Sequence, residues 1–329
     1  MKNKNMILVV LSVLCCILIG GVVYTVFFVE KDENSKENII SESESESKEE
    51  TSNSDKIVVD GVEYRPNTNI QTILFMGIDK QAKGVDGSRP GENGQSDSLN
   101  LLIIDRETKQ AKILQINRDS MVDVEVYSVD GVKVRTESMQ IALQYAYGDG
   151  EEQSCRLTAE RVSELLYGVD IQSYLSLTLE GMSEIADAIG GVQMTIPEDY
   201  TVIDPAFVKG ATITMDGKLV EKYVRTRDID ELDSNLDRMK RQQQFMNALI
   251  QKIQTMEGKA QYMSLYQKME PYMVTNMTAE EMVALAEYDI DDQTMEVPGE
   301  VIYKDGHAQY IVDNESLQKN VLKTFYKSN

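Results

Sequence analysis

Residues 70–78 read IQTILFMGI, a compact apolar run that ends in Gly77-Ile78 and is followed at once by Asp79. A short apolar run bounded by polar residues predicts a buried strand. Residues 99–104 and 113–116 are two more apolar runs, joined by a polar turn at 106–110. This spacing predicts an antiparallel pair of strands.

The sequence on either side alternates between strand and helix patterns. Period-two alternation predicts strands, and apolar residues every three to four positions predict helices. The expected elements are a hairpin at 57–65, helices at 139–147, 157–166, 182–189, 217–224 and 236–256, strands at 175–179 and 192–196, a helix opened by Thr278 and Glu281, a hairpin at 301–312, and a last helix with Leu317, Val321 and Phe325. Strands and helices interleave with no break in composition, so residues 57–329 predict one α/β domain with a mixed sheet covered by helices.

The N-terminal region predicts a membrane anchor. Residues 6–29 form an uncharged apolar run, MILVVLSVLCCILIGGVVYTVFFV, and about 20 apolar residues suffice to cross a bilayer. Lys2 and Lys4 precede the run and acidic residues follow it, which places residues 1–5 in the cytoplasm and the remainder outside. Residues 30–56 are acidic and nearly without apolar side chains, so we expect a disordered linker there. The sequence thus predicts a single-pass protein of the cell membrane with an extracytoplasmic domain.

Composition excludes several kinds of chemistry. The formal net charge is −22, which argues against a nucleic-acid partner. The chain has one histidine, His307, and of its three cysteines only Cys155 lies outside the apolar N-terminal run. These counts exclude a histidine-based triad, a multi-histidine zinc site and a disulfide within the folded domain. Catalysis would depend on Asp, Glu, Arg, Lys, Tyr or Ser side chains, or on a bound metal.

The candidate active-site residues lie in polar segments at the ends of the predicted strands and helices. Asp79 and Asp97 lie at two strand ends, and such carboxylates suit Mg²⁺, which binds one or two of them together with substrate phosphates. A set of arginines could bind the phosphate oxygens bidentately. An equally simple interpretation makes each aspartate a turn residue and the arginines part of a solvated face paired with nearby acids. The residues by themselves leave both interpretations open.

Seven short segments follow one another in a fixed order. They read Gly77-Ile-Asp79, Ser96-Asp97-Ser98, Asn117-Arg118-Asp119, Tyr145-Ala-Tyr147-Gly148, Gly190-Gly191-Val192-Gln-Met-Thr-Ile196-Pro197, Tyr223-Val-Arg225-Thr-Arg227 and Arg238-Met-Lys-Arg241-Gln242-Gln243. Their order resembles the LytR–CpsA–Psr family, whose members carry G-x-D, S-D-T, R-D, A-Y-A-Y-G, G-G-V-x-V-x-(V/I)-P, Y-V-R-x-R and R-x-x-R-Q-Q. Seven segments in one order are far more specific than any one of them.

The resemblance implies a phosphotransferase that moves a teichoic-acid-like or capsular glycopolymer from polyprenyl pyrophosphate onto peptidoglycan in a Gram-positive envelope, with release of polyprenyl phosphate. Asp79 and Asp97 would bind Mg²⁺, and Arg118 would contact the pyrophosphate near the reacting phosphorus. Asp119, or another carboxylate near Arg118, is a candidate to orient the acceptor hydroxyl, the alternative being that Asp119 only holds Arg118 in place. An apolar tunnel would hold the polyprenyl tail. Further pyrophosphate contacts would come from Arg225, Arg227, Arg238, Arg241 and Gln242.

The chain departs from the family pattern at three places, one of which is the segment between Arg227 and Arg238 in place of the usual glycine- and aspartate-rich loop. Lys80-Gln81 stands where an arginine usually follows G-x-D, and Gln140-Ile141-Ala142 replaces K-I-N. The replacement of K-I-N removes a lysine and an asparagine that often lie near the site in similar proteins. Two other functions therefore stay open: a non-catalytic binder of polyprenyl lipids that regulates envelope assembly, and a pyrophosphatase that uses water as the acceptor. A binder would keep its lipid affinity without the aspartates, through the buried area of the tail.

Overall fold

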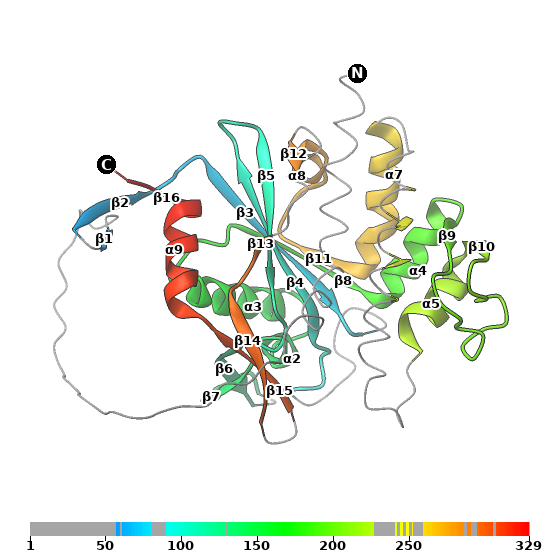
Figure 1. The fold of residues 1–329 in the computed structure, drawn as a ribbon, viewed down its shortest axis with the longest axis horizontal. Helices are drawn as coiled ribbons and strands as arrows, with labels where there is room; N and C mark the ends of the chain where they lie inside the picture. Colours follow the sequence, from blue (N-terminus) through cyan, green and yellow to red (C-terminus); the bar gives the residue numbers. More distant parts are fainter. Residues whose placement is uncertain are drawn as a thin grey trace, which may run out of the picture.

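The structure, a computed structural model, describes most of the chain after residue 56 (Figure 1). The described residues are 57–59, 61–80, 90–128, 130–226, 241, 244–245, 248–249, 252, 259–285, 288–290, 295–304 and 307–328. The predicted membrane segment at 6–29 and the predicted linker at 30–56 lie outside these ranges. Among the described residues, no helix has the length and apolar character needed to cross a membrane.

A mixed seven-stranded sheet forms the centre of the domain, in the order β11-β8-β3-β4-β5-β12, with β13 also paired to β5. β3, β4 and β5 form an antiparallel meander, β8 runs parallel to β3, and β12 and β13 run parallel to β5. The strand bounds are β3 (Ile70–Ile78), β4 (Ser96–Asp105), β5 (Gln110–Ile116), β8 (Ser173–Thr178), β11 (Met273–Thr275), β12 (Asp289–Ile290) and β13 (Met295–Glu296).

Helices cover both faces of this sheet, and alternate residues of β3 enter two separate cores. Ile73 and Phe75 belong to one core and Leu74 and Met76 to the other, and all four are 0% exposed. The period-two geometry of a strand explains this division. The first core is covered by α4 (Leu179–Ala188), α5 (Gly217–Arg225), α7 (Lys259–Met269) and α8 (Ala279–Ala284). The second core is covered by α2 (Leu143–Ala146), α3 (Glu152–Leu165) and α9 (Asn314–Phe325). Figure 1 shows α4, α5 and α7 on one side of the sheet and α3 and α9 on the other.

Small ribbons surround the sheet. Each is antiparallel, and the first has three strands because the C-terminal β16 pairs with β2. Their bounds are β1 (Ile57–Val59), β2 (Val62–Pro66) and β16 (Tyr326–Ser328); β6 (Met121–Tyr127) and β7 (Lys133–Gln140); β9 (Val192–Thr195) and β10 (Thr212–Met215); and β14 (Gly299–Lys304) and β15 (His307–Val312). A 3-10 turn, η1 (Glu270–Tyr272), precedes β11.

The structure confirms most of the predicted elements. The strand at 70–78, the antiparallel pair that follows it, and the helix closed by Gly190 and Gly191 all form, and both glycines have positive φ. The predicted capping box of Thr278 and Glu281 is present at α8. Most of the amphipathic helix predicted at 236–256 lies outside the described residues.

One prediction is wrong. A helix was expected at 139–147, whereas β7 continues to Gln140 and only Leu143–Ala146 is helical. β7 pairs along its length with β6, from Met121 opposite Gln140 to Tyr127 opposite Lys133. Hairpin pairing therefore overrides the local helical periodicity, and it brings the end of β7 beside the segment that follows β5.

Candidate active site

The candidate site lies where strands of the central sheet end at one edge. β3 and β8 run parallel and pair at Ile78 and Thr178, and Ser96 of β4 lies opposite Ile78. β5 is antiparallel to β4 and ends at Ile116, opposite Leu99. The residues that follow β3 and β5 therefore meet the first residues of β4. This edge collects Asp79, Asp97, Arg118 and Asp119.

Asp79 and Asp97 are brought together by one peptide group. The Asp79 N–H donates to the carbonyl oxygen of Gln95 over 2.9 Å, and the Asp97 N–H donates to the same oxygen over 3.0 Å. The two aspartates thus flank a single carbonyl, although 18 residues separate them in the sequence. The backbone thus places these two residues next to each other at the sheet edge.

Arg118 is held by three side chains at this edge. Its Nη1 forms an ion pair with Oδ1 of Asp97, and its Nη2 donates to Oε1 of Gln95 over 2.9 Å. Its Nε lies 3.4 Å from Oδ1 of Asp119. The Arg118 side chain is 17% exposed, so its guanidinium is fixed in orientation yet reachable from solvent. A planar guanidinium in this state is suited to bind phosphate oxygens.

Asp119 is held between Arg118 and Gln140. Gln140 Nε2 donates to Asp119 Oδ1 over 2.7 Å. Burial raises the pKa of Asp119 above its ordinary value, and the adjacent Arg118 guanidinium opposes part of that rise. Burial disfavours the charged form of a carboxyl, while a neighbouring cation favours it. Burial of Asp119 therefore favours its protonated form, and the Arg118 guanidinium favours its charged form.

The donor set at this edge fits Mg²⁺ only if a ligand supplies further oxygens. Within the described part of the chain, no group of three or more His, Cys, Asp and Glu side chains is arranged to hold a metal ion. Asp79 and Asp97 donate their backbone N–H groups to one carbonyl oxygen, and Mg²⁺ commonly binds one or two carboxylates together with substrate phosphates and water. These two residues could hold such an ion only together with oxygens from a phosphate ligand or water.

The arginines near α5 differ from Arg118 in their surroundings. Arg225 is the last residue of α5, and its Nη1 bonds to Glu221 one turn earlier, with 38% of the arginine side chain exposed. Arg241 is only 4% exposed. Its Nε donates to the carbonyl oxygen of Tyr223 over 2.8 Å and its Nη2 donates to the carbonyl of Thr226. Arg241 thus binds the last carbonyls of α5, which have no partners within the helix.

The structure consequently divides the predicted site residues into three groups. Asp79, Asp97, Arg118 and Asp119 come together at the sheet edge. Arg225 and Arg241 are placed at the C-terminal end of α5, where Arg241 has a structural role that its motif did not predict. The remaining predicted contacts lie outside the described residues: Arg227, Arg238 and Gln242.

Two glutamines of the site were not predicted. Gln95 bonds Arg118 and presents its carbonyl to both aspartates. Gln140, which we had identified only as a departure from K-I-N, bonds Asp119. A signal was present for each, because Gln95 opens the S-D-S segment and Gln140 occupies the position of a family lysine. Glutamine is common on exposed surfaces, however, and neither position indicates its partner.

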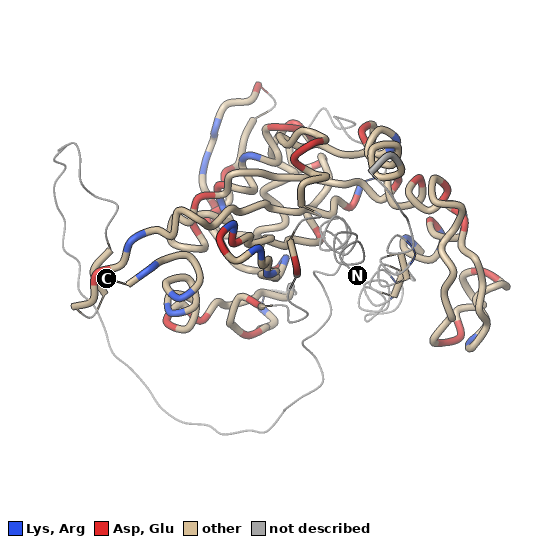
Figure 2. Tube along the Cα trace, turned by 90° about the horizontal axis from the view of Figure 1, so that it is seen from above, with Lys and Arg blue, Asp and Glu red and all other residues tan. Residues whose placement is uncertain are grey.

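The positively charged Arg118 guanidinium lies in a protein that is acidic overall. Figure 2 shows Asp and Glu spread along the trace with Lys and Arg between them, in a chain whose formal net charge is −22. A pyrophosphate approaching this molecule meets a predominantly acidic protein. Its binding would thus depend on local cations and on a metal ion rather than on the overall field.

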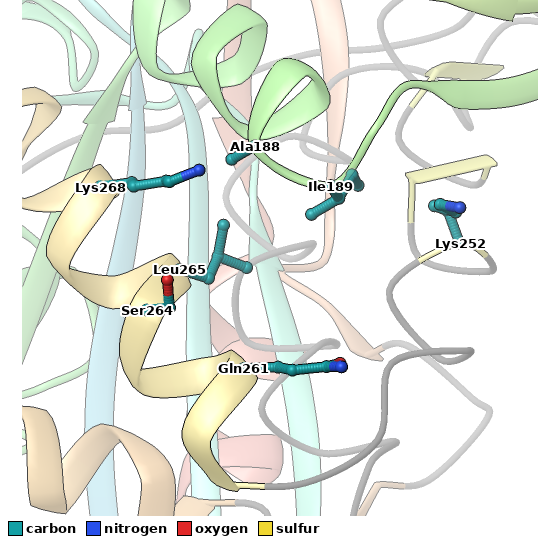
Figure 3. A pocket seen from close by; sticks show the side chains of 7 residues that line it. All are labelled: Ala188, Ile189, Lys252, Gln261, Ser264, Leu265 and Lys268. Carbon is teal, nitrogen blue, oxygen red and sulfur yellow. The ribbon is translucent and has the colours of Figure 1, made fainter.

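A separate cavity of about 420 Å³ lies between the end of α4 and α7. Figure 3 shows Gln261, Leu265 and Lys268 projecting from α7 toward the region of Ile189. α4 begins beside the sheet edge, where the Leu179 N–H donates to the carbonyl of Lys80, and a helix of this length extends ~15 Å. The cavity is therefore at the opposite end of α4 from the candidate site. The other lining residues are Ala188, Lys252 and Ser264.

The chain matches a known protein family over most of its length. The LytR_cpsA_psr family matches residues 24–325. TagV of Bacillus subtilis strain 168, a polyisoprenyl-teichoic acid–peptidoglycan teichoic acid transferase, is 27% identical over 220 residues, which cover 65% of this chain and 51% of TagV. TagU of Bacillus cereus strain AH820, of the same description, is 25% identical over 309 residues, which cover 93% of this chain and 89% of TagU.

A solved structure supports the fold. The crystal structure of B. subtilis TagV superposes with a TM-score of 0.56 at 24% identity, over 78% of this chain and 96% of that chain. The alignment with the full TagV sequence spans only about half of TagV's length, 51%. The family match nevertheless extends through nearly all of the described domain, up to residue 325, and includes every segment at the sheet edge. The chain belongs to the LytR_cpsA_psr family.

Proposed function

We propose that this protein transfers a glycopolymer from polyprenyl pyrophosphate onto peptidoglycan and releases polyprenyl phosphate. One observation carries the proposal: Arg118 is fixed at the sheet edge by Asp97, Gln95 and Asp119, beside Asp79. A pyrophosphate ester needs its negative charge neutralised at both the attacked and the leaving phosphate. A guanidinium and two carboxylates able to share Mg²⁺ provide that neutralisation.

The proposed roles follow from the partners of each side chain. Asp79 and Asp97 would hold Mg²⁺, which would supply charge stabilisation at the leaving phosphate. Arg118, whose Nη1 is paired with Asp97, binds oxygens of the phosphate that carries the polymer. Asp119 orients the acceptor hydroxyl and receives its proton.

The chemical step is a displacement at phosphorus. The acceptor hydroxyl oxygen forms a bond to the phosphorus that bears the glycopolymer, and the bond between that phosphorus and the bridging oxygen breaks. The bridging oxygen leaves with the polyprenyl phosphate, and the hydroxyl proton passes to the Asp119 carboxylate. The product is a phosphodiester between glycopolymer and peptidoglycan.

The other predicted residues complete the proposal around this centre. Arg225, Arg227 and Arg238 contact outer phosphate oxygens, with Gln242 as an additional donor. Arg241 stabilises the end of α5 from which Arg225 projects. The residue 6–29 segment anchors the chain in the cell membrane of a Gram-positive bacterium, with the domain on the extracytoplasmic side, where lipid-linked donor and peptidoglycan acceptor meet.

The experiment uses the full-length protein in detergent with a polyprenyl-pyrophosphate-linked oligosaccharide and peptidoglycan fragments, with and without Mg²⁺. Released polyprenyl phosphate and glycan attached to the fragments are both measured. We expect magnesium-dependent attachment that Arg118→Ala and Asp97→Ala abolish, while the control Arg156→Ala, an exposed arginine paired with Glu160, retains it.

The other outcomes separate the competing functions. Release without attachment, even with fragments in excess, would identify a pyrophosphatase. Lipid binding with no release, unchanged in Asp97→Ala, would identify a binder and overturn the proposed transfer reaction.

A further inference from the structure

We infer that Gln140 is a positioning residue that ties the C-terminal hairpin β14–β15 to the Arg118–Asp119 pair and thereby selects the Asp119 oxygen that faces the acceptor. This inference deepens the proposed function and rests on it for its kinetic readout. It concerns a position where the chain departs from the family's K-I-N segment, and a hairpin that lies outside all seven of the segments described above.

The amide of Gln140 is fully committed to this arrangement. Gln140 is the last residue of β7 and lies opposite Met121 in the hairpin register. Its Nε2 donates to Asp119 Oδ1 over 2.7 Å and to the carbonyl oxygen of Ala308, in β15, over 2.8 Å. An amide nitrogen carries two hydrogens, so both are used. Two donor bonds in different directions fix the plane of the amide.

A second set of bonds joins the same two regions through the backbone. The Tyr310 N–H donates to the carbonyl oxygen of Asp119 over 2.8 Å, and Ser120 and Tyr310 form a parallel bridge. The Tyr310 hydroxyl donates to the carbonyl oxygen of Val297 over 2.7 Å, and the Val297 N–H donates to the carbonyl of Gln115 in β5 over 3.0 Å. The path from β5 through Asp119, β15 and Val297 back to β5 is closed.

This closed path determines which carboxylate oxygen is presented to a substrate. Both side-chain contacts of Asp119, from Arg118 Nε and from Gln140 Nε2, are made to Oδ1. Within the described ranges, no hydrogen bond reaches Oδ2. The acceptor hydroxyl therefore meets Oδ2, while Oδ1 is held by two donors. A reacting group held in one orientation contributes through proximity, and small displacements are costly.

The charge of the residue at position 140 matters less than its donors. A neutral amide orients Asp119 without neutralising it, so Arg118 is the cation in contact with this carboxylate. A lysine at position 140 would keep one donor to Asp119 and add a charge. An apolar or acidic side chain would supply no donor at all. These three cases can be compared directly.

The experiment compares Gln140→Leu, Gln140→Glu and Gln140→Lys with Gln110→Leu, an exposed glutamine at the opposite end of β5. Leu and Glu variants should lose about 10-fold in kcat, with KM changed less than about twofold, because positioning of a bound reactant is lost. Gln140→Lys should recover most of kcat, and Gln110→Leu should match the wild type. Thermal unfolding of each variant verifies that the domain folds.

Hydrogen–deuterium exchange provides a readout that needs no turnover. In Gln140→Leu, amides of residues 117–122 and 308–311 should exchange faster than in the wild type, while peptides of β3 and β4 stay unchanged. Unchanged exchange in both segments, or wild-type kcat in Gln140→Leu, would overturn the positioning role. If the wild type itself shows no turnover with any acceptor, the proposed transfer reaction fails, and the exchange comparison decides on Gln140 independently.

Discussion

Arg118 and Arg241 are the same residue type in two regions of the molecule, but the hydrogen-bond partners given for them among the described residues differ in kind. Arg118 binds side chains, two of them carboxylates, at the sheet edge. Arg241 binds backbone carbonyls at the end of α5 and lies with its guanidinium carbon 5.5 Å from the centre of the Tyr200 ring. Their exposure differs accordingly, because Arg118 is half-buried and Arg241 is buried.

This difference in partners indicates which of the two arginines is able to bind a ligand. Carboxylate partners can be shared with a metal ion, and their place at the guanidinium can be taken by phosphate oxygens of the same charge. Backbone carbonyls at a helix end cannot leave without uncovering buried acceptors, which costs about 1–3 kcal/mol for each. We therefore assign Arg118 to chemistry and Arg241 to the support of the fold, although both occur in family motifs.

The largest expected effect comes from Arg118→Ala. Loss of a preorganised phosphate ligand should lower kcat by about 100- to 1,000-fold. The unfolding temperature should also fall, because Asp97 and Asp119 are part-buried carboxylates that lose their cationic partner. Steady-state transfer assays and thermal unfolding measure the two quantities. A fully active variant would remove the distinction between the two arginines.

Arg241→Met tests the other side of the comparison. It keeps much of the side-chain volume but leaves the carbonyls of Tyr223 and Thr226 without their donors, so unfolding should become easier by about 2–4 kcal/mol. Chemical denaturation measures this change, with the exposed Arg156→Ala as control. Turnover per folded molecule should fall less than in Arg118→Ala. Unaltered stability would mean that Arg241 does not support α5.

Asp119→Asn sharpens the comparison through pH. The pKa of Asp119 is raised by burial, so the folded state binds this proton more readily than the unfolded state. The contribution of this carboxyl to stability is therefore greatest below its unfolded pKa and falls as pH rises through the folded pKa. The asparagine variant lacks this fall, so its stability relative to the wild type should be greater at neutral pH than at acidic pH. Unfolding measured across that pH range checks the sign.

The smallest effect should come from Arg225→Ala. This side chain is 38% exposed and paired with Glu221 one turn away, and such helical surface pairs contribute about 0.3–0.5 kcal/mol. Stability should hardly change. If Arg225 contacts an outer phosphate as proposed, KM for the lipid donor should rise about two- to tenfold while kcat changes little. An unchanged KM would confine the phosphate-binding role to the sheet edge.

Much of the fold could be predicted because burial patterns are local. The run at 70–78 forms β3 at those bounds, and the apolar positions Leu317, Val321 and Phe325 of the last helix are buried. The membrane segment at 6–29 stays a prediction, since it lies outside the described residues. The helix expected at 139–147 was wrong because its first residues pair with β6, and such pairing depends on a partner strand rather than on local periodicity.

The sequence by itself determined where the main strands lie, which polar residues stand at their ends and which family segments are present. Each of these depends on residues close together in the chain. Through the family segments the sequence predicted Asp79, Asp97, Arg118 and Asp119 as parts of one site, together with Arg225, Arg227, Arg238, Arg241 and Gln242. Only the tertiary structure decided the partners. Gln140 meets Ala308 across 168 residues, and Arg241 is turned toward α5 rather than toward the sheet edge. Such contacts arise when separate elements pack, and the spacing of residues along the chain contains no direct record of them.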